Sequence, residues 1–303
     1  MNRTIALIAL AAALLLPHIA GPYWTGLVTL MYIFGLLALS IDLLLGHAGL
    51  FSLTHASFFA VSAYTVAILQ VRYGVPTLLA APAGVLAGTL LALLFGLAVR
   101  TRGVYFILIT IAFGYVVWGV AHRWSSFTGG DNGVTNVPFP AAGPLAITSH
   151  TQYYYLVLVA VILCALGYRV LIRSPFGLGL RGIKASESRM RSLGYRTTLH
   201  LYAAFVLSGA LASFAGVLYV YYNKFVNPVA ASFQVSVEAA LMAIVGGSGT
   251  LIGAFIGAGV VLGLRNWVSS FFELHAAVMG AVFIATVLWA PQGLVGLARR
   301  FFK

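Results

Sequence analysis

Long apolar runs separated by short polar stretches fill most of this chain. Ten runs can be distinguished, and several reach the ~20 residues that an α-helix needs to cross a bilayer. The pattern predicts an all-α polytopic membrane protein, one domain over residues 1–303, with about ten transmembrane or re-entrant helices. The predicted helices are residues 5–18, 27–45, 54–69, 77–99, 104–122, 153–172, 201–222, 235–245, 251–267 and 276–290.

The placement of the basic residues predicts the topology. Charged residues are 7% of the chain, against roughly 25% in soluble domains. The basic residues that give the net charge of +12 lie between apolar runs rather than on one soluble face. They therefore indicate membrane topology and not nucleic-acid binding. With ten crossings, the side that holds most Lys and Arg is the cytoplasm, and both termini lie there. No Ala-x-Ala cleavage pattern follows Pro17, so the first run is predicted to remain as a span.

One polar stretch, residues 174–195, is rich in cations and cannot lie in lipid. Within a loop at residues 174–200, it has the pattern of a short surface helix with Ile183 and Met190 on one face. Glu187 is spaced to pair with Lys184 or Arg191. The stretch is predicted to contact another protein; a helix resting on lipid headgroups is the alternative. The candidate contact residues are Arg181, Ile183, Lys184, Ser186, Glu187, Met190, Leu193 and Gly194.

Glycines break the predicted helices at two places, GHAGLFSLTHASFFAVSAYT from residue 46 and VGGSGTLIGAFIGAG from residue 245. Broken backbone at membrane depth is tolerated where it is buried in protein or lines a cavity. These segments are therefore predicted to line a pathway, with tight helix packing through small residues as the alternative. The candidate pathway residues are Gly46, His47, Gly49, Ser52, His55, Ser57, Gly246 and Gly247.

Two further motifs leave alternatives open. The run TGGDNG lies in a predicted outer loop at residues 123–152 and is typical of a turn; a docking contact or gate is the alternative. Its candidate residues are Thr128, Gly129, Gly130 and Asp131. The run GGSG fits the G-x-S-G pattern of rhomboid intramembrane serine proteases, with Ser248 and His275 as the hypothetical pair.

Motifs that the sequence lacks narrow the mechanism. There is no G-x-x-x-x-G-K-[ST] phosphate loop and no H-E-x-x-H zinc motif. We therefore expect no cofactor, no metal and no ATP hydrolysis by this chain. Only Asp42 and Glu238 are plausible intramembrane carboxylates, whereas ion-driven carriers usually display several. The pattern indicates a pathway that depends on another protein for energy; a stand-alone channel or carrier is the alternative.

Several motifs together resemble one known family. Residues 46–65 are similar to the G-x-x-G-x-x-S-L-G-H-A-x-F-F-x-x-G-A-Y-T signature of branched-chain amino acid ABC-transporter permeases of the LivM type. GVYFILITIAF, RWSSFTGGDNG, SPFGLGLRGIKASESRMRSLGY and GSGTLIGAFIGA resemble further elements of that family, in family order. The chain departs from the usual pattern at Asp42, where an amide is common, and at Thr54, Ser186 and Met190.

The resemblance implies a permease subunit, not an enzyme, in the inner membrane of a bacterium. Such systems pair it with a second related permease, two cytoplasmic ATP-binding subunits and a periplasmic substrate-binding protein. Residues 174–200 would be the cytoplasmic coupling loop and residues 123–152 a periplasmic loop. The family imports leucine, isoleucine and valine, while close relatives carry other amino acids, urea or short amides.

Overall fold

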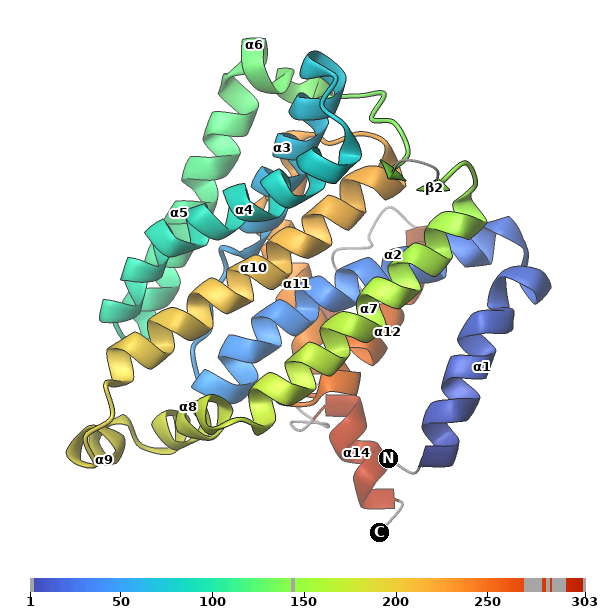
Figure 1. Ribbon diagram of the computed structural model, residues 1–303. Coiled ribbons are helices and arrows are strands. Elements are labelled where there is room, and N and C mark those ends of the chain that lie inside the picture. The colour runs from blue at the N-terminus through green and yellow to red at the C-terminus, as the bar shows by residue number, and fades with distance from the viewer. Residues whose placement is uncertain (1–2, 143–144, 270–279, 282–283, 285–292, 302–303) are drawn as a thin grey trace.

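The protein is a helical bundle (Figure 1), seen in a computed structural model that describes residues 3–142, 145–269, 280–281, 284 and 293–301. Within these ranges, six helical segments are long and apolar enough to cross a membrane. They are Gly21–Ala48, Thr77–Arg100, Val104–Arg123, His150–Arg173, Thr197–Asn223 and Leu251–Val268. The prediction of an all-helical multi-pass membrane protein is confirmed; the count of about ten is not, and predicted segment 276–290 lies outside the described residues except at 280–281 and 284.

The helices run between two ends of the bundle (Figure 1). One end carries α6, η3 and the short strand pair β1–β2, and the other carries α8, α9 and α14. The elements are α1 (Arg3–Ile19), α2 (Gly21–Asp42), η1 (Leu43–Ala48), α3 (His55–Tyr73), α4 (Thr77–Phe95), η2 (Gly96–Arg100), α5 (Val104–Arg123), α6 (Ser125–Thr128), η3 (Gly130–Asn132), β1 (Ala141–Ala142), β2 (Leu145–Ala146), α7 (His150–Arg173), α8 (Pro175–Ala185), α9 (Glu187–Ser192), α10 (Thr197–Asn223), η4 (Pro228–Ala231), α11 (Phe233–Gly246), α12 (Leu251–Ser269) and α14 (Gly293–Phe301).

Helix α2 forms the centre of the bundle. Its second half is buried on every side, from Ile33 to Asp42, which is typical of a helix that is apolar all round. Helices α3, α10, α11 and α12 pack around it or around each other. Helices α5 and α7 instead expose most of their apolar side chains, as outer helices of a membrane protein do.

The first broken passage begins where α2 ends. The backbone changes to a π-helix over η1, turns at Gly49 with a φ of 73°, and is non-helical to residue 54. Helix α3 then begins at His55, whose Nε2 lies 2.6 Å from the Ser208 hydroxyl near the middle of α10. The break predicted at Gly46 and Gly49 is therefore present, and α3 begins inside the bundle.

A second non-helical passage lies between α10 and α11, and the chain enters it from the opposite end of the bundle. After α10, Val226 pairs with Val134 of the loop that follows η3, and the chain then descends through η4. Helix α11 begins at Phe233, whose ring stacks on Tyr115 near the middle of α5. The amide of Ala56, in the first turn of α3, donates to the Ser236 hydroxyl of α11 at 3.0 Å. Two helices that start inside the bundle thus meet at their amino-terminal turns.

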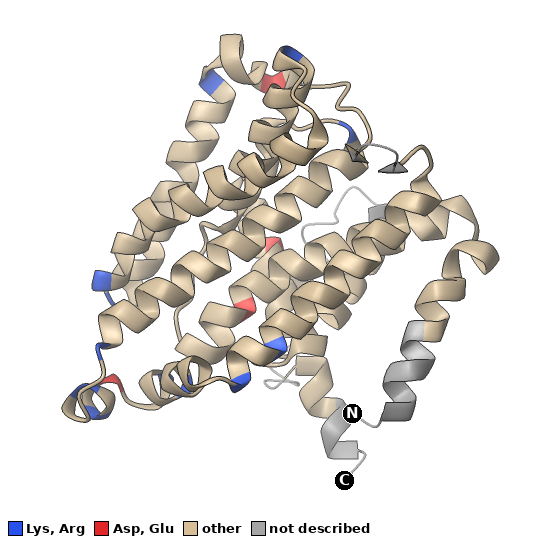
Figure 2. Cartoon of the chain, viewed as in Figure 1, with Lys and Arg blue, Asp and Glu red and all other residues tan. Residues whose placement is uncertain are grey.

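Most Lys and Arg residues lie toward the two ends of the bundle (Figure 2). The end with α8 and α9 carries a dense group of Lys and Arg, and fewer cations lie at the end with α6. This separation agrees with the distribution that the sequence predicted. Inside the bundle, Arg265 of α12 pairs with Glu238 of α11 at 3.0 Å, so this cation is neutralised by a carboxylate. Sequence reasoning missed that pair.

Candidate translocation and coupling site

The carboxylate of Asp42 joins the two glycine-rich segments. Asp42 is buried at the end of α2, and its Oδ1 accepts a hydrogen bond of 2.6 Å from the Gly249 amide. Its Oδ2 accepts one of 2.9 Å from the Tyr168 hydroxyl, which also lies 3.3 Å from Nδ1 of His47. The amide that Asp42 accepts from belongs to the loop before α12.

Backbone contact between the two segments is close. A Cβ atom on Gly46 would lie 2.5 Å from the Gly249 nitrogen and 2.7 Å from its Cα, nearer than real Cβ atoms come. Gly247 and Gly249 have φ values of 118° and 81°, which L-residues rarely adopt. Gly246 packs on Gly253 of α12. The glycines thus permit a close crossing of η1 and the loop before α12. Of the predicted pathway residues, Gly46 lies at this crossing, while Gly246 and Gly247 lie at the end of α11, just before Gly249.

A cluster of buried hydroxyl groups surrounds the start of α3. The Ser208 hydroxyl lies 2.6 Å from His55 and donates to the Ser40 carbonyl at 2.5 Å, and it therefore accepts from Nε2–H of a neutral imidazole. Ser52 and Ser57 are also completely buried. These predicted pathway residues are brought together at the start of α3, and the structure is closed at this depth.

The cationic stretch forms two helices rather than the single helix that the sequence predicted. Helix α8 ends at Ala185, and Ser186 caps α9 by accepting a hydrogen bond from the Arg189 amide. Ser, like Asp and Asn, favours this position because its side chain satisfies a free amide of the first turn. Ile183 is buried and Met190 packs on Gly182, whereas Leu193 is exposed. The predicted common face therefore does not run along one helix.

Lys184 ties α8 to the first broken passage. Its Nζ donates a hydrogen bond of 2.7 Å to the Gly46 carbonyl, which lies in η1. Its aliphatic stem also lies against Gly49, where a Cβ would be 3.1 Å from Lys184 Cγ. Arg181 donates to the Ile172 carbonyl at the end of α7. Lys184 is thus a physical contact between the cationic stretch and the predicted pathway, and not the partner of Glu187.

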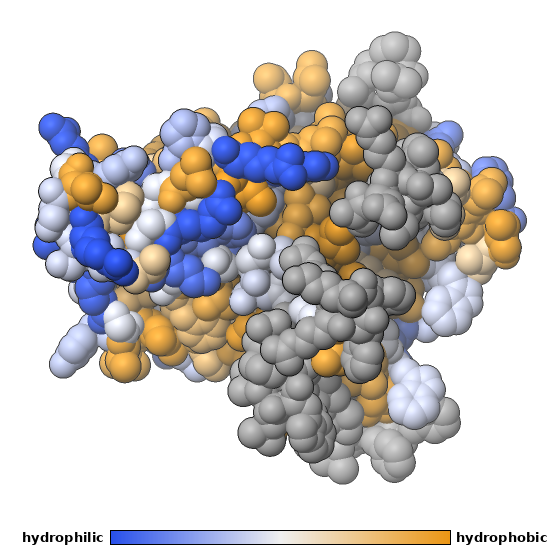
Figure 3. All heavy atoms as spheres, turned by 90° about the horizontal axis from the view of Figure 1, so that it is seen from below, coloured by the Kyte–Doolittle hydropathy of each residue, from blue (hydrophilic) through white to orange (hydrophobic). Residues whose placement is uncertain are grey.

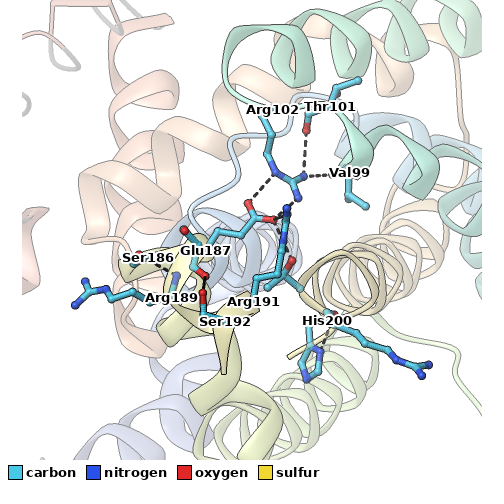
Figure 4. A network of polar contacts seen from close by, with 12 residues as sticks. Val99, Thr101, Arg102, Ser186, Glu187, Arg189, Arg191, Ser192 and His200 are labelled. Carbon is cyan, nitrogen blue, oxygen red and sulfur yellow. Dashed lines mark hydrogen bonds and ion pairs between the residues drawn. The ribbon is translucent and has the colours of Figure 1, made fainter. Parts of the chain in front are cut away.

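Glu187 is the centre of a polar network at the same end (Figure 4). Arg102 donates to both carboxylate oxygens, at 2.9 and 2.7 Å, in the paired geometry that guanidinium and carboxylate groups favour. Arg191 donates at 3.0 Å, as the spacing predicted, and Thr197 donates at 3.0 Å. Arg102 also donates to the Val99 carbonyl. The network connects α9 to the α4–α5 turn and to the start of α10.

The same contacts lower the pKa of Glu187. The hydrogen bond from Arg102 is the main cause, partial burial opposes it, and Thr197 and Arg191 lower the pKa further. Because the folded pKa lies below the ordinary value, the network stabilises α9 fully at pH values above the ordinary carboxyl pKa. This stabilisation is lost as the pH falls through the lowered pKa.

The outer-loop motif forms a tight turn. Gly129 and Gly130 have φ values of 82° and 58°, and the buried Thr128 hydroxyl donates to the Ala121 carbonyl at 2.6 Å. Asp131 is exposed and lies 2.7 Å from Nδ1 of His122. Among the described residues, no group of three His, Cys, Asp or Glu side chains is arranged to hold a metal ion. The turn that the sequence favoured is present.

The protease hypothesis gains no support. Ser248 is exposed in the turn between α11 and α12, and His275 lies outside the described residues. The turn instead serves the helix crossing, because the next residue, Gly249, donates its amide to Asp42.

Apolar spans around two interrupted helices define a multi-pass membrane permease. A family model described as "branched-chain amino acid transport system / permease component" matches residues 23–287, and the chain belongs to this family. The predicted resemblance is therefore confirmed, and with it the prediction of a transport subunit.

Relatives cover nearly the whole chain. The high-affinity branched-chain amino acid transport system permease protein LivM of Salmonella typhimurium is 28% identical, over 96% of this chain and 75% of its own length. LivM of Escherichia coli K12 is 28% identical, over 99% of this chain and 76% of its own. A probable branched-chain amino acid transport permease protein LivH of Methanocaldococcus jannaschii is 27% identical, over 86% and 88%. No solved structure matches the chain.

Proposed function

We propose that this chain is a permease subunit of a bacterial ABC importer for branched-chain or other hydrophobic amino acids. It receives the solute from a periplasmic binding protein and releases it into the cytoplasm. The observation that carries the proposal is the contact between the cationic α8–α9 segment and the broken passage, made by Lys184 with the Gly46 carbonyl. Family membership and the relatives' names support the substrate class.

The proposal assigns ATP hydrolysis to partner subunits. The chain has no phosphate loop of its own, so it requires two cytoplasmic ATP-binding subunits and a second related permease in the inner membrane. The end of the bundle with α8, α9 and most cations is then cytoplasmic, together with both termini. Residues 123–152 are periplasmic. This orientation places the binding protein at the end with α6.

In this proposal α8 and α9 form the coupling element. Figure 3 shows hydrophilic and hydrophobic residues interleaved on the end of the molecule that would face the ATP-binding subunits. Leu178 and Leu193 are exposed there, while Ile183 and the Arg102–Glu187 pair hold the element against the bundle. A displacement of α8 is transmitted to Gly46 directly by the Lys184 hydrogen bond, without an intervening flexible loop.

The pathway then runs past the crossing of the two broken helices. Opening it requires Gly46 and Gly249 to separate and the hydroxyl cluster near His55 to become accessible. Both changes follow if α8 moves η1, because Lys184 binds the Gly46 carbonyl in η1 and Asp42, directly before η1, binds the Gly249 amide.

Transport by the reconstituted complex tests the proposed function. Proteoliposomes that contain both permeases, the ATP-binding subunits and loaded binding protein are expected to accumulate leucine only with ATP. Uptake by the permeases alone would identify a stand-alone carrier. Inhibition by urea or short amides, but not by valine or isoleucine, would identify a different solute.

Accessibility of Ser57 tests the pathway. In a Cys164→Ser background, a cysteine at Ser57 is expected to react with a small water-soluble thiol reagent in one nucleotide state and to be protected in another. Ser213→Cys is the matched control, because Ser213 of α10 is equally buried but packs against Gly88 of α4. Protection of Ser57→Cys in every state, in a complex that still transports, would contradict the assignment.

Reversing the charge of Glu187 tests coupling. Glu187→Arg places a third cation beside Arg102 and Arg191, so α9 is expected to detach from the α4–α5 turn. ATPase stimulation by loaded binding protein should fall about tenfold or more, with membrane insertion unchanged, because one partly exposed ion pair contributes little to global stability. Ser188→Arg introduces the same side chain at the neighbouring exposed position and should preserve stimulation. Restoration in the Arg102→Glu, Glu187→Arg double variant would show that the pair itself matters.

A further inference from the structure

A cavity of about 550 Å³ lies at the end of the bundle that carries α9. It is formed by η2 at the end of α4, by α9 and by the first turns of α10. Three arginines line it, Arg100, Arg191 and Arg196. Leu97, Leu199 and Tyr202 supply apolar walls.

The charges around this cavity are unbalanced. Arg102 lies beside it through the Glu187 network, which raises the local count to four guanidinium groups. Glu187 pairs with two of them, Arg102 and Arg191. The cationic excess makes the cavity suited to an anion, and planar guanidinium groups match the oxygen atoms of a phosphate.

The apolar part of the cavity points to an amphiphile. Leu97 and Leu199 are about half exposed and lie at the ends of two helical segments that are long and apolar enough to span a membrane. The apolar surface continues along α4 through the exposed Leu93 and Leu94, and the Tyr202 hydroxyl donates to the Leu93 carbonyl. Cations therefore meet a strip of exposed leucines at the end of the spans, where headgroups and acyl chains of a bilayer meet.

We propose that this cavity binds the headgroup of an anionic phospholipid, with an acyl chain along the leucine strip of α4. Basic pockets between transmembrane helices bind such headgroups because they place positive charge at the level of the headgroups. A free phosphate would use only the arginines, and an acidic segment of a protein would leave the leucine strip without a function. This inference does not depend on which solute the permease carries.

Lipid binding would act on the coupling segment. Arg191 both lines the cavity and donates to Glu187. A phosphate in the cavity competes with Glu187 for this guanidinium, so the bound lipid adjusts how firmly α9 is held to Arg102. The effect of the lipid on α9 therefore depends on the Arg191 side chain, which the cavity and Glu187 share.

Native mass spectrometry of the purified protein, exchanged from phosphatidylcholine–phosphatidylglycerol nanodiscs, tests the proposal. The wild type is expected to retain phosphatidylglycerol in preference to phosphatidylcholine. Arg100→Gln with Arg196→Gln should weaken this binding about twenty-five-fold, the product of about fivefold for each cation near an anionic surface. The matched control, Arg72→Gln with Arg123→Gln, removes two cations from the opposite end and should retain the lipid.

Two further arms identify the source of the anion. Leu97→Gln keeps all the arginines and should still reduce phosphatidylglycerol retention, and added inorganic phosphate should not displace the lipid. Displacement by phosphate, or equal retention by the wild type and the Arg100, Arg196 double variant, would overturn the proposal. So would a double variant that keeps the lipid but loses the ATP-binding subunits in a pull-down, because the cavity would then be a protein contact. Size-exclusion profiles establish that each variant is folded.

Discussion

Replacing Gly46 by alanine is expected to abolish transport. The new Cβ would lie 2.5 Å from the backbone nitrogen of Gly249 and 2.7 Å from an oxygen of Asp42. Backbone cannot turn aside as the end of a long side chain does, so η1 and the loop before α12 must separate. The separation costs about 2–4 kcal/mol through overpacking and the weakened Asp42–Gly249 hydrogen bond.

The matched control is Gly119→Ala on α5. A Cβ at Gly119 meets nothing within 4 Å, so this variant gains the ~0.5–1 kcal/mol by which alanine exceeds glycine inside a helix. Thermal unfolding of the purified complex and leucine uptake in proteoliposomes measure both variants. The Gly46→Ala complex should unfold at a lower temperature and lose at least about nine-tenths of uptake. A Gly46→Ala variant as stable and active as Gly119→Ala would mean that the two broken helices do not cross closely in the working protein.

Local rules predicted most helices correctly. The predicted segments 104–122, 153–172 and 251–267 lie within α5, α7 and α12, whose ends are at most a few residues away. The break at Gly46 followed from glycine and from the cost of unpaired backbone in lipid. Ser186 shows the limit of such rules. A serine inside an amphipathic pattern is tolerated in a helix and preferred at an N-cap, and spacing alone does not distinguish the two.

The contacts that make the candidate site could not be predicted, because they join distant parts of the chain. Asp42 accepts from an amide 207 residues away, Lys184 reaches a carbonyl 138 residues away, and Glu187 pairs with an arginine 85 residues away. Helical periodicity describes neighbours within one or two turns. It suggested Lys184 as a partner of Glu187, whereas the fold offers each of them a better partner from another element.

Replacing Asp42 by leucine is expected to abolish transport, while asparagine preserves it. Leucine has no acceptor, so the Gly249 amide loses its partner, and the Tyr168 hydroxyl keeps only Nδ1 of His47, 3.3 Å away. A buried donor without an acceptor costs ~1–3 kcal/mol. The loop before α12 would then no longer be held against the end of α2.

Asparagine is the informative control, since it removes the charge and keeps the shape. Its Oδ1 accepts from the Gly249 amide and its Nδ2–H donates to the Tyr168 oxygen, whose proton then turns toward Nδ1 of His47, 3.3 Å away. The Gly249 amide and the Tyr168 hydroxyl each keep a partner, so ATP-driven uptake and thermal stability should stay close to wild type. Equal loss of uptake in Asp42→Asn and Asp42→Leu, with both inserted in the membrane, would show that the charge itself is required. Asp42 would then be a proton or solute contact rather than the acceptor that holds two broken helices together.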